Sequence, residues 1–149
     1  MAITADQPLR FLGEPTSIRW VLDNSAAYTI YKGSAGVIDQ TGDASYPIAG
    51  STITVAADDV CIGIAAAQQA VLTTDREVDN VVEFYTYPSI VGFKSTVFAI
   101  ADLEDPVYQD AEGALSTTAA DVPEIGTVFW VEDGYVYVKL NTPQICSGA

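Results

Sequence analysis

Carboxylates are the side chains of this sequence that could most readily do chemistry. A group of them lies within one short stretch: Asp102, Glu104, Asp105, Asp110 and Glu112. Closely spaced carboxylates are typical of calcium sites, because Ca²⁺ takes about six to eight oxygen ligands. The stretch lacks the central glycine of an EF-hand loop, and Pro106 interrupts it. We therefore expect a solvated loop beside a hairpin here, and no metal site.

No other pattern of reactive residues indicates an enzyme. With 20 acidic residues, no pair can be chosen from sequence as a glycosidase dyad. The segment Asp39-Gln40-Thr41-Gly42 is one residue too long for an aspartic-protease motif, and Gly33-Ser34-Ala35-Gly36 lacks the spacing of a phosphate loop. The chain has no histidine, which is the commonest general base and metal ligand. We expect a protein without catalytic residues or cofactor; a small acidic hydrolase would need a carboxylate pair in a cleft.

The charge balance excludes two kinds of partner. The 149 residues contain 6 Lys and Arg against 20 Asp and Glu, for a net charge of −14. Nucleic acids and anionic membranes are bound through clustered Lys and Arg, so we expect neither as a partner. Apolar residues make up 49% of the chain and charged residues only 17%. This combination indicates that the protein buries surface against other subunits as well as in its own core.

The elements that must position these side chains are strands. Runs rich in β-branched and aromatic residues, bounded by turn residues, occur at 17–22, 27–32, 35–38, 51–55, 60–64, 81–87, 90–100, 114–118, 125–131 and 135–140. A helix competes with a strand only over residues 58–72, where two aspartates could cap it and alanine and glutamine are frequent at 65–70; we favour a strand first, at 60–64, with no assignment for the rest of the stretch. About nine or ten short strands with little helix predict an all-β fold, either a small barrel or a sandwich.

The clearest local signal is a hairpin near the C-terminus. Asp133-Gly134 separates the runs 125–131 and 135–140, and this dipeptide favours a tight two-residue turn. In the second run Val136, Val138 and Leu140 share one face of the strand, while Tyr135, Tyr137 and Lys139 share the other.

The first residues predict an extended N-terminal arm over 1–16, followed by one β-rich domain over 17–149. Pro8 and Pro15 oppose a helix, and Leu9, Phe11 and Leu12 need a surface to cover them. That surface is either a neighbouring subunit or the arm's own domain. The N-terminus lacks the basic and apolar regions of a signal peptide, so we expect synthesis in a cytoplasm.

The two cysteines, Cys61 and Cys146, do not form a disulfide framework. Cys61 lies in an apolar run, where a free cysteine behaves as a small buried side chain. We favour free thiols, and a bridge between the two stays open.

Alternating aromatic residues form a second candidate binding surface: Tyr85, Tyr87, Trp130, Tyr135 and Tyr137. Such residues could stack against sugars, but cross-strand aromatics more commonly stabilise a sheet or a subunit interface. We therefore assign these residues to a candidate oligomer interface, with carbohydrate binding or adhesion as the alternative function.

The order of turns and strands in the C-terminal third resembles the head-decoration, or capsid cement, proteins of tailed bacteriophages. The resemblance is carried by these segments: Ile100-Ala101-Asp102-Leu103-x-Asp105-Pro106-Val107-Tyr108, Asp110-x-x-Gly113-x-Leu115-Ser116-Thr117-Thr118-Ala119, Pro123-x-Ile125-Gly126-x-Val128 and Val131-x-Asp133-Gly134-x-Val136-x-Val138-x-Leu140. The clear part covers about residues 96–140. The acidity and the tyrosine-rich middle of this chain depart from the family pattern.

The resemblance implies a β-barrel or β-tulip domain that assembles as a homotrimer on the exterior of the virion. Its partners would be the major capsid protein and itself, and its action would be to stabilise the shell by binding. Pro8, Leu9, Phe11 and Leu12 would contact the capsid or a sister subunit, and the five aromatic residues are candidates for the trimer interface.

Overall fold

The fold is all-β, as the sequence predicts. The computed structural model describes residues 5–39, 46–50, 59–76, 79–110, 113–118, 123–142 and 144–145. These residues contain strands β1 to β14, and a 3₁₀ turn spans Ile100–Asp102. The strands are shorter and more numerous than expected, and they form three antiparallel sheets whose pairing, within the described residues, does not close into a barrel.

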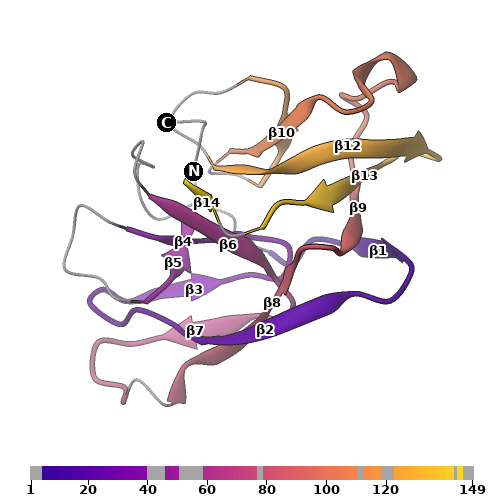
Figure 1. Cartoon of the computed structure of the whole chain (residues 1–149). Helices are drawn as coiled ribbons and strands as arrows, with labels where there is room; N and C mark the ends of the chain where they lie inside the picture. The colour runs from indigo at the N-terminus through magenta and orange to yellow at the C-terminus, as the bar shows by residue number, and fades with distance from the viewer. Residues whose placement is uncertain are drawn as a thin grey trace.

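The first sheet, which we call sheet A, contains both the predicted hairpin and residues 9–12 of the predicted arm. Its strand order is β1-β9-β13-β12-β10-β11. The strands are β1 (Leu9–Leu12), β9 (Ile90–Lys94), β13 (Tyr135–Leu140), β12 (Glu124–Glu132), β10 (Pro106–Gln109) and β11 (Leu115–Ser116). In Figure 1 this sheet occupies the upper right of the molecule.

The second sheet, sheet B, has the order β2-β8-β6-β4-β5, and β14 also pairs with β6. Its strands are β2 (Thr16–Val21), β8 (Val81–Thr86), β6 (Val60–Ala65), β4 (Ala35–Ile38), β5 (Ile48–Ala49) and β14 (Gln144–Ile145). A third, small sheet consists of β3 (Tyr28–Ile30) and β7 (Gln69–Val71).

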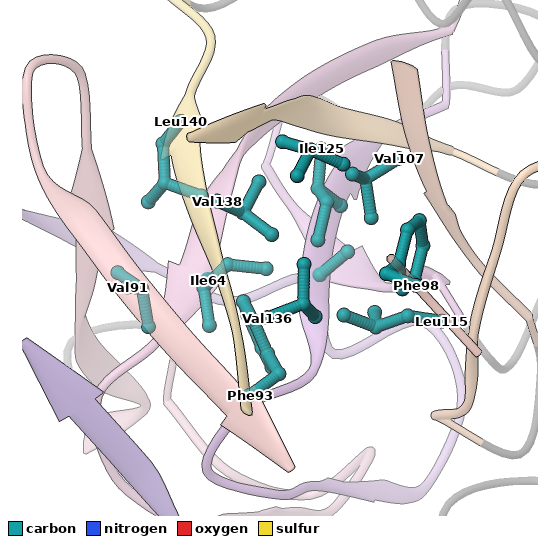
Figure 2. Close-up of a cluster of buried hydrophobic side chains, with 12 residues drawn as sticks. Ile64, Val91, Phe93, Phe98, Val107, Leu115, Ile125, Val136, Val138 and Leu140 are labelled. Carbon is teal, nitrogen blue, oxygen red and sulfur yellow. The ribbon is translucent and has the colours of Figure 1, made fainter. Parts of the chain in front are cut away.

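Two hydrophobic cores hold these sheets together in layers. The larger core lies between the inner face of sheet A and the strands β4 and β6, with Val91, Phe93, Val136 and Val138 packed toward Ile64 (Figure 2). The smaller core lies on the other side of sheet B, where Phe84 and Ile62 pack against residues of β3 and β7. The predicted inward face of β13, formed by Val136, Val138 and Leu140, is confirmed because all three side chains are buried.

A buried glutamine fastens β10 of sheet A to β4 of sheet B. The Gln109 side-chain amide donates a hydrogen bond of 2.7 Å to the Gly33 carbonyl, and its Oε1 accepts one of 2.7 Å from the Ala35 amide. The side chain thus satisfies two backbone groups that have no water available.

Several segments differ from the sequence-based prediction. Residues 69–71, within the stretch where a helix competed with a strand, form β7, which pairs with β3. The strand expected over 90–100 ends at Lys94, and a 3₁₀ turn follows at Ile100–Asp102. The strand expected over 51–55 lies outside the described residues.

The prediction of free thiols is wrong for Cys61. Its side chain is buried, as expected, but it is disulfide-bonded. The chain contains one other cysteine, Cys146, which lies outside the described residues. Spacing alone does not give this bond, because pairing depends on how close the fold brings two Cα atoms.

Candidate protein-docking face

The residues predicted to anchor an extended arm do not leave the domain. Residues 9–12 form β1, which pairs antiparallel with β9 at the edge of sheet A. The side chains of Leu9 and Phe11 pack against the larger core, and the Phe11 ring meets the Tyr85 ring edge-on with centroids 4.8 Å apart. The sequence left open whether this segment covers a neighbouring subunit or its own domain, and the structure shows it on its own domain. Pro8 and Leu12 are the two of the four predicted residues that stay exposed.

The five aromatic residues expected at a subunit interface divide into covered and exposed ones. Tyr85 lies between the sheets beside Phe11, and burial raises its pKa. Tyr137 is buried and Tyr135 is half-buried, whereas Trp130 and Tyr87 are exposed. They therefore do not form one exposed row of the kind expected for sugar stacking.

Three of these aromatics nevertheless share the outer face of sheet A with basic residues. Pairing places Arg10 opposite Gly92, Gly92 opposite Tyr137, and Tyr137 opposite Trp130. In the next row Lys94 is opposite Tyr135. Lys139 is on the same face because it lies two residues after Tyr137. We call this surface the cation–aromatic face, and it consists of Arg10, Lys94, Trp130, Tyr135, Tyr137 and Lys139.

Gly92 allows the side chains of Arg10 and Tyr137 to approach each other at the middle of this face. A Cβ atom at Gly92 would lie 2.8 Å from Cε1 of Tyr137 and 3.1 Å from Cβ of Arg10. The Tyr137 ring thus lies across the glycine and becomes buried. The Arg10 guanidinium lies over the Tyr135 ring, 3.9 Å from its centroid, and interaction with the Tyr137 hydroxyl raises the pKa of Arg10. Arg10 is therefore held in place by two rings of the neighbouring strand β13.

A β-bulge turns two consecutive aromatic residues outward. The pairing of β12 with β13 shifts register between Val128 and Trp130, which leaves Phe129 as the additional residue. Without the shift, successive side chains would alternate between the core and solvent. With it, Phe129 is 49% exposed and Trp130 is 43% exposed.

Lys139 lies between two open hollows beside the cation–aromatic face. One, of about 280 Å³, is lined by Tyr87, Thr127 and Lys139 together with residues 140–142. The other, of about 700 Å³, has Phe129, Glu104 and Lys139 among its lining residues. The Lys139 ammonium also lies 5.6 Å from the Tyr87 ring centroid. This edge of the face thus offers concave surface, aromatic rings and a positive charge together.

The basic residues of the face have no acidic partner within the part of the chain that the structure describes. Arg76 is paired with Asp79 at 3.1 Å, but no such ion pair involves Arg10, Lys94 or Lys139. The face combines arginine, tyrosine and tryptophan, the residue types that contribute most of the binding energy at protein interfaces. It is therefore a candidate surface for docking another polypeptide.

The acidic segment from Asp102 to Asp110 forms the 3₁₀ turn, the following tight turn and β10. Among the described residues no group of three or more potential metal ligands is present; Glu112 lies outside them. No helix in the described ranges is long and apolar enough to cross a membrane.

Comparison with protein-family models, with curated proteins and with solved structures finds no match for this chain.

Sequence reasoning found Trp130, Tyr135 and Tyr137 but missed Arg10, Lys94 and Lys139 as members of one surface. The basic residues are far apart in sequence and come together only because β1, β9 and β13 are neighbours. Phe129 was missed because strict alternation would bury either it or Trp130. In the sequence, the alternation of Tyr135, Tyr137 and Lys139 in the hairpin was the signal that these three side chains share a face.

Proposed function

We propose that this protein is a structural component of a tailed-phage virion that binds the outer surface of the capsid, assembles there as a homotrimer, and stabilises the shell. The family resemblance of residues 96–140 supports this proposal, and so does an all-β domain with a protein-docking surface. Binding alone is sufficient for such a role, because a protein that binds only the assembled shell stabilises it by mass action.

The observation that carries the proposal is the exposed pair Phe129 and Trp130 beside the basic residues Arg10, Lys94 and Lys139 on the outer face of sheet A. Large aromatic side chains that project together from a rigid strand lose little conformational entropy on binding, and they dominate affinity where they become buried. Their fixed position on β12, between the strands β10 and β13, suits attachment to a large, rigid partner.

The test is co-sedimentation of the purified protein with capsid shells that lack it, prepared from the phage whose genome carries this coding sequence. The wild-type chain is expected to saturate a fixed number of sites. The double variant Phe129→Ser/Trp130→Ser is expected to bind at least about tenfold more weakly. Absence of saturable binding by the wild type would refute the proposal.

A matched control separates loss of the docking pair from a general loss of surface hydrophobicity. Leu72 is also exposed but follows β7, at the edge of the small third sheet. The variant Leu72→Ser should bind as the wild type does. Deletion of residues 1–12 is a poorer test, because it removes β1 and uncovers the core beneath Leu9 and Phe11.

A further inference from the structure

Half of the basic residues in this acidic chain lie on one face of one sheet. Of the 6 Lys and Arg, three are on the outer face of sheet A: Arg10 on β1, Lys94 on β9 and Lys139 on β13. The others are dispersed, with Arg19 on β2 of sheet B, Lys32 after β3 and Arg76 after β7. In a chain of net charge −14, this is a local reversal of sign.

The local excess of positive charge acts mainly on a partner that is in contact with the face. At physiological ionic strength charges farther away than about 8 Å are largely screened, so a partner in contact with the face senses mainly the charges within it. Two carboxylates adjoin the three basic residues: Glu132 lies on the face itself, because it pairs with Tyr135 in the row of Lys94, and Glu104 lines the larger hollow with Lys139. Neither forms an ion pair with the three basic residues.

The arginine of this face is already positioned for a ligand. Its guanidinium carbon lies 3.9 Å from the Tyr135 ring centroid, and the group also interacts with the Tyr137 hydroxyl, so two side chains of β13 hold it on the outer face. A guanidinium has five N–H donors, and those that face solvent can donate to a carboxylate. Because the ring restricts the side chain beforehand, less entropy is lost when the carboxylate binds.

We propose that the cation–aromatic face binds a carboxylate-rich segment of a partner polypeptide, with Arg10, Lys94 and Lys139 contacting its Asp and Glu side chains and Phe129 and Trp130 packing against its apolar atoms. Charge complementarity selects an acidic occupant, and the exposed aromatic pair offers a surface on which apolar side chains of a polypeptide can pack. Three cations in a chain with 20 acidic residues are too few to release the counterions on which nucleic-acid binding depends. The identification of that partner as a capsid subunit rests on the function proposed above, whereas the chemistry of the face does not.

The test uses the full chain and a fluorescein-labelled peptide in which glutamates alternate with leucines, with binding followed by fluorescence anisotropy. Wild-type protein is expected to bind the peptide and to lose affinity as salt is raised. The variant Lys94→Gln/Lys139→Gln should bind about threefold to tenfold more weakly. Arg19→Gln, which removes a cation from the outer side of β2, should bind as the wild type does.

Three other outcomes of the anisotropy experiment would contradict the proposal. Equal affinity of the double variant and the wild type would place the peptide elsewhere. Equal or tighter binding of polygalacturonate or single-stranded DNA would assign the face to a glycan or a nucleic acid. No peptide binding at low salt would overturn the inference outright.

Capsid co-sedimentation distinguishes this inference from the function on which it rests. If shells bind wild type and Lys94→Gln/Lys139→Gln equally, the capsid role stands and the acidic-partner inference fails. If the peptide binds with the expected dependence and the shells do not bind at all, the inference stands and the capsid role fails.

Discussion

The Arg10 guanidinium lies 3.9 Å from the centroid of the Tyr135 ring, so one edge strand of sheet A is fastened to a strand that it does not pair with. Between β1 and β13 lies β9, and at the crossing point β9 has Gly92. The absence of a side chain there lets Arg10 and the two tyrosines of β13 meet above the sheet. The same contact that organises the outer face also covers the backbone of β9.

Replacement of Gly92 by alanine should destabilise the fold. The added Cβ would lie 2.8 Å from the Tyr137 ring, so the ring or the strand must move. Such overpacking typically costs about 1–3 kcal/mol in the free energy of unfolding. Urea denaturation followed by circular dichroism measures the loss. Adding Tyr137→Leu, a smaller side chain without the ring, should recover part of it, and a fully stable Gly92→Ala protein would contradict the close approach.

Gln109→Met should destabilise the connection between β10 and β4 while preserving the size of the side chain. The change leaves the Gly33 carbonyl and the Ala35 amide without their buried partners. Each unsatisfied buried group costs about 1–3 kcal/mol, so a total loss of about 2–6 kcal/mol is expected in urea denaturation. Gln68→Met, at an exposed position, is the control and should change stability by less than about 0.5 kcal/mol.

The parts of this fold that sequence predicts are those with a local cause. The hairpin of β12 and β13 follows from Asp133-Gly134, both of which have positive φ, 53° and 75°, as a tight hairpin turn requires. The buried face of β13 follows from strict alternation. The pairing of β1 with β9 has no local cause, since the strands meet only when distant parts of the chain collapse together. The position of Arg10 above Tyr135 therefore could not be predicted, and neither could the bulge at Phe129.

Cys61 should have no free thiol in the purified protein under non-reducing conditions, because it is disulfide-bonded. Thiol titration of the unfolded, unreduced chain should detect no reactive group, and two should appear per chain after reduction. Cys61→Ala should lower the free energy of unfolding by about 2–4 kcal/mol, as is typical for loss of a native disulfide. A titratable thiol in the unreduced protein would contradict this assignment.

The contribution of Tyr28 to stability should disappear at high pH. Its hydroxyl donates a 2.7 Å hydrogen bond to the Asp23 carbonyl, and burial, together with the charge of Asp23, raises its pKa above the usual value near 10. A raised pKa in the folded state means that this contribution is complete below about pH 10 and is lost as pH rises beyond it. Tyr28→Phe should therefore cost about 1 kcal/mol at pH 7. Its deficit relative to wild type should shrink above pH 10 in urea denaturation series, and a constant deficit would contradict the raised pKa.

The fluorescence of Trp130 should report the local positive charge of the cation–aromatic face. In the variant Trp20→Phe, Trp130 is the one remaining tryptophan, and it is 43% exposed beside Tyr137 on the face that carries Arg10. At low ionic strength iodide should quench it at least about twice as efficiently as caesium, although a net charge of −14 acting uniformly would favour the cation. Adding Lys94→Gln and Lys139→Gln should reduce the preference for iodide, whereas Arg19→Gln should leave it unchanged. Stronger quenching by caesium would mean that the overall acidity, and not the three neighbouring cations, determines the potential at this surface.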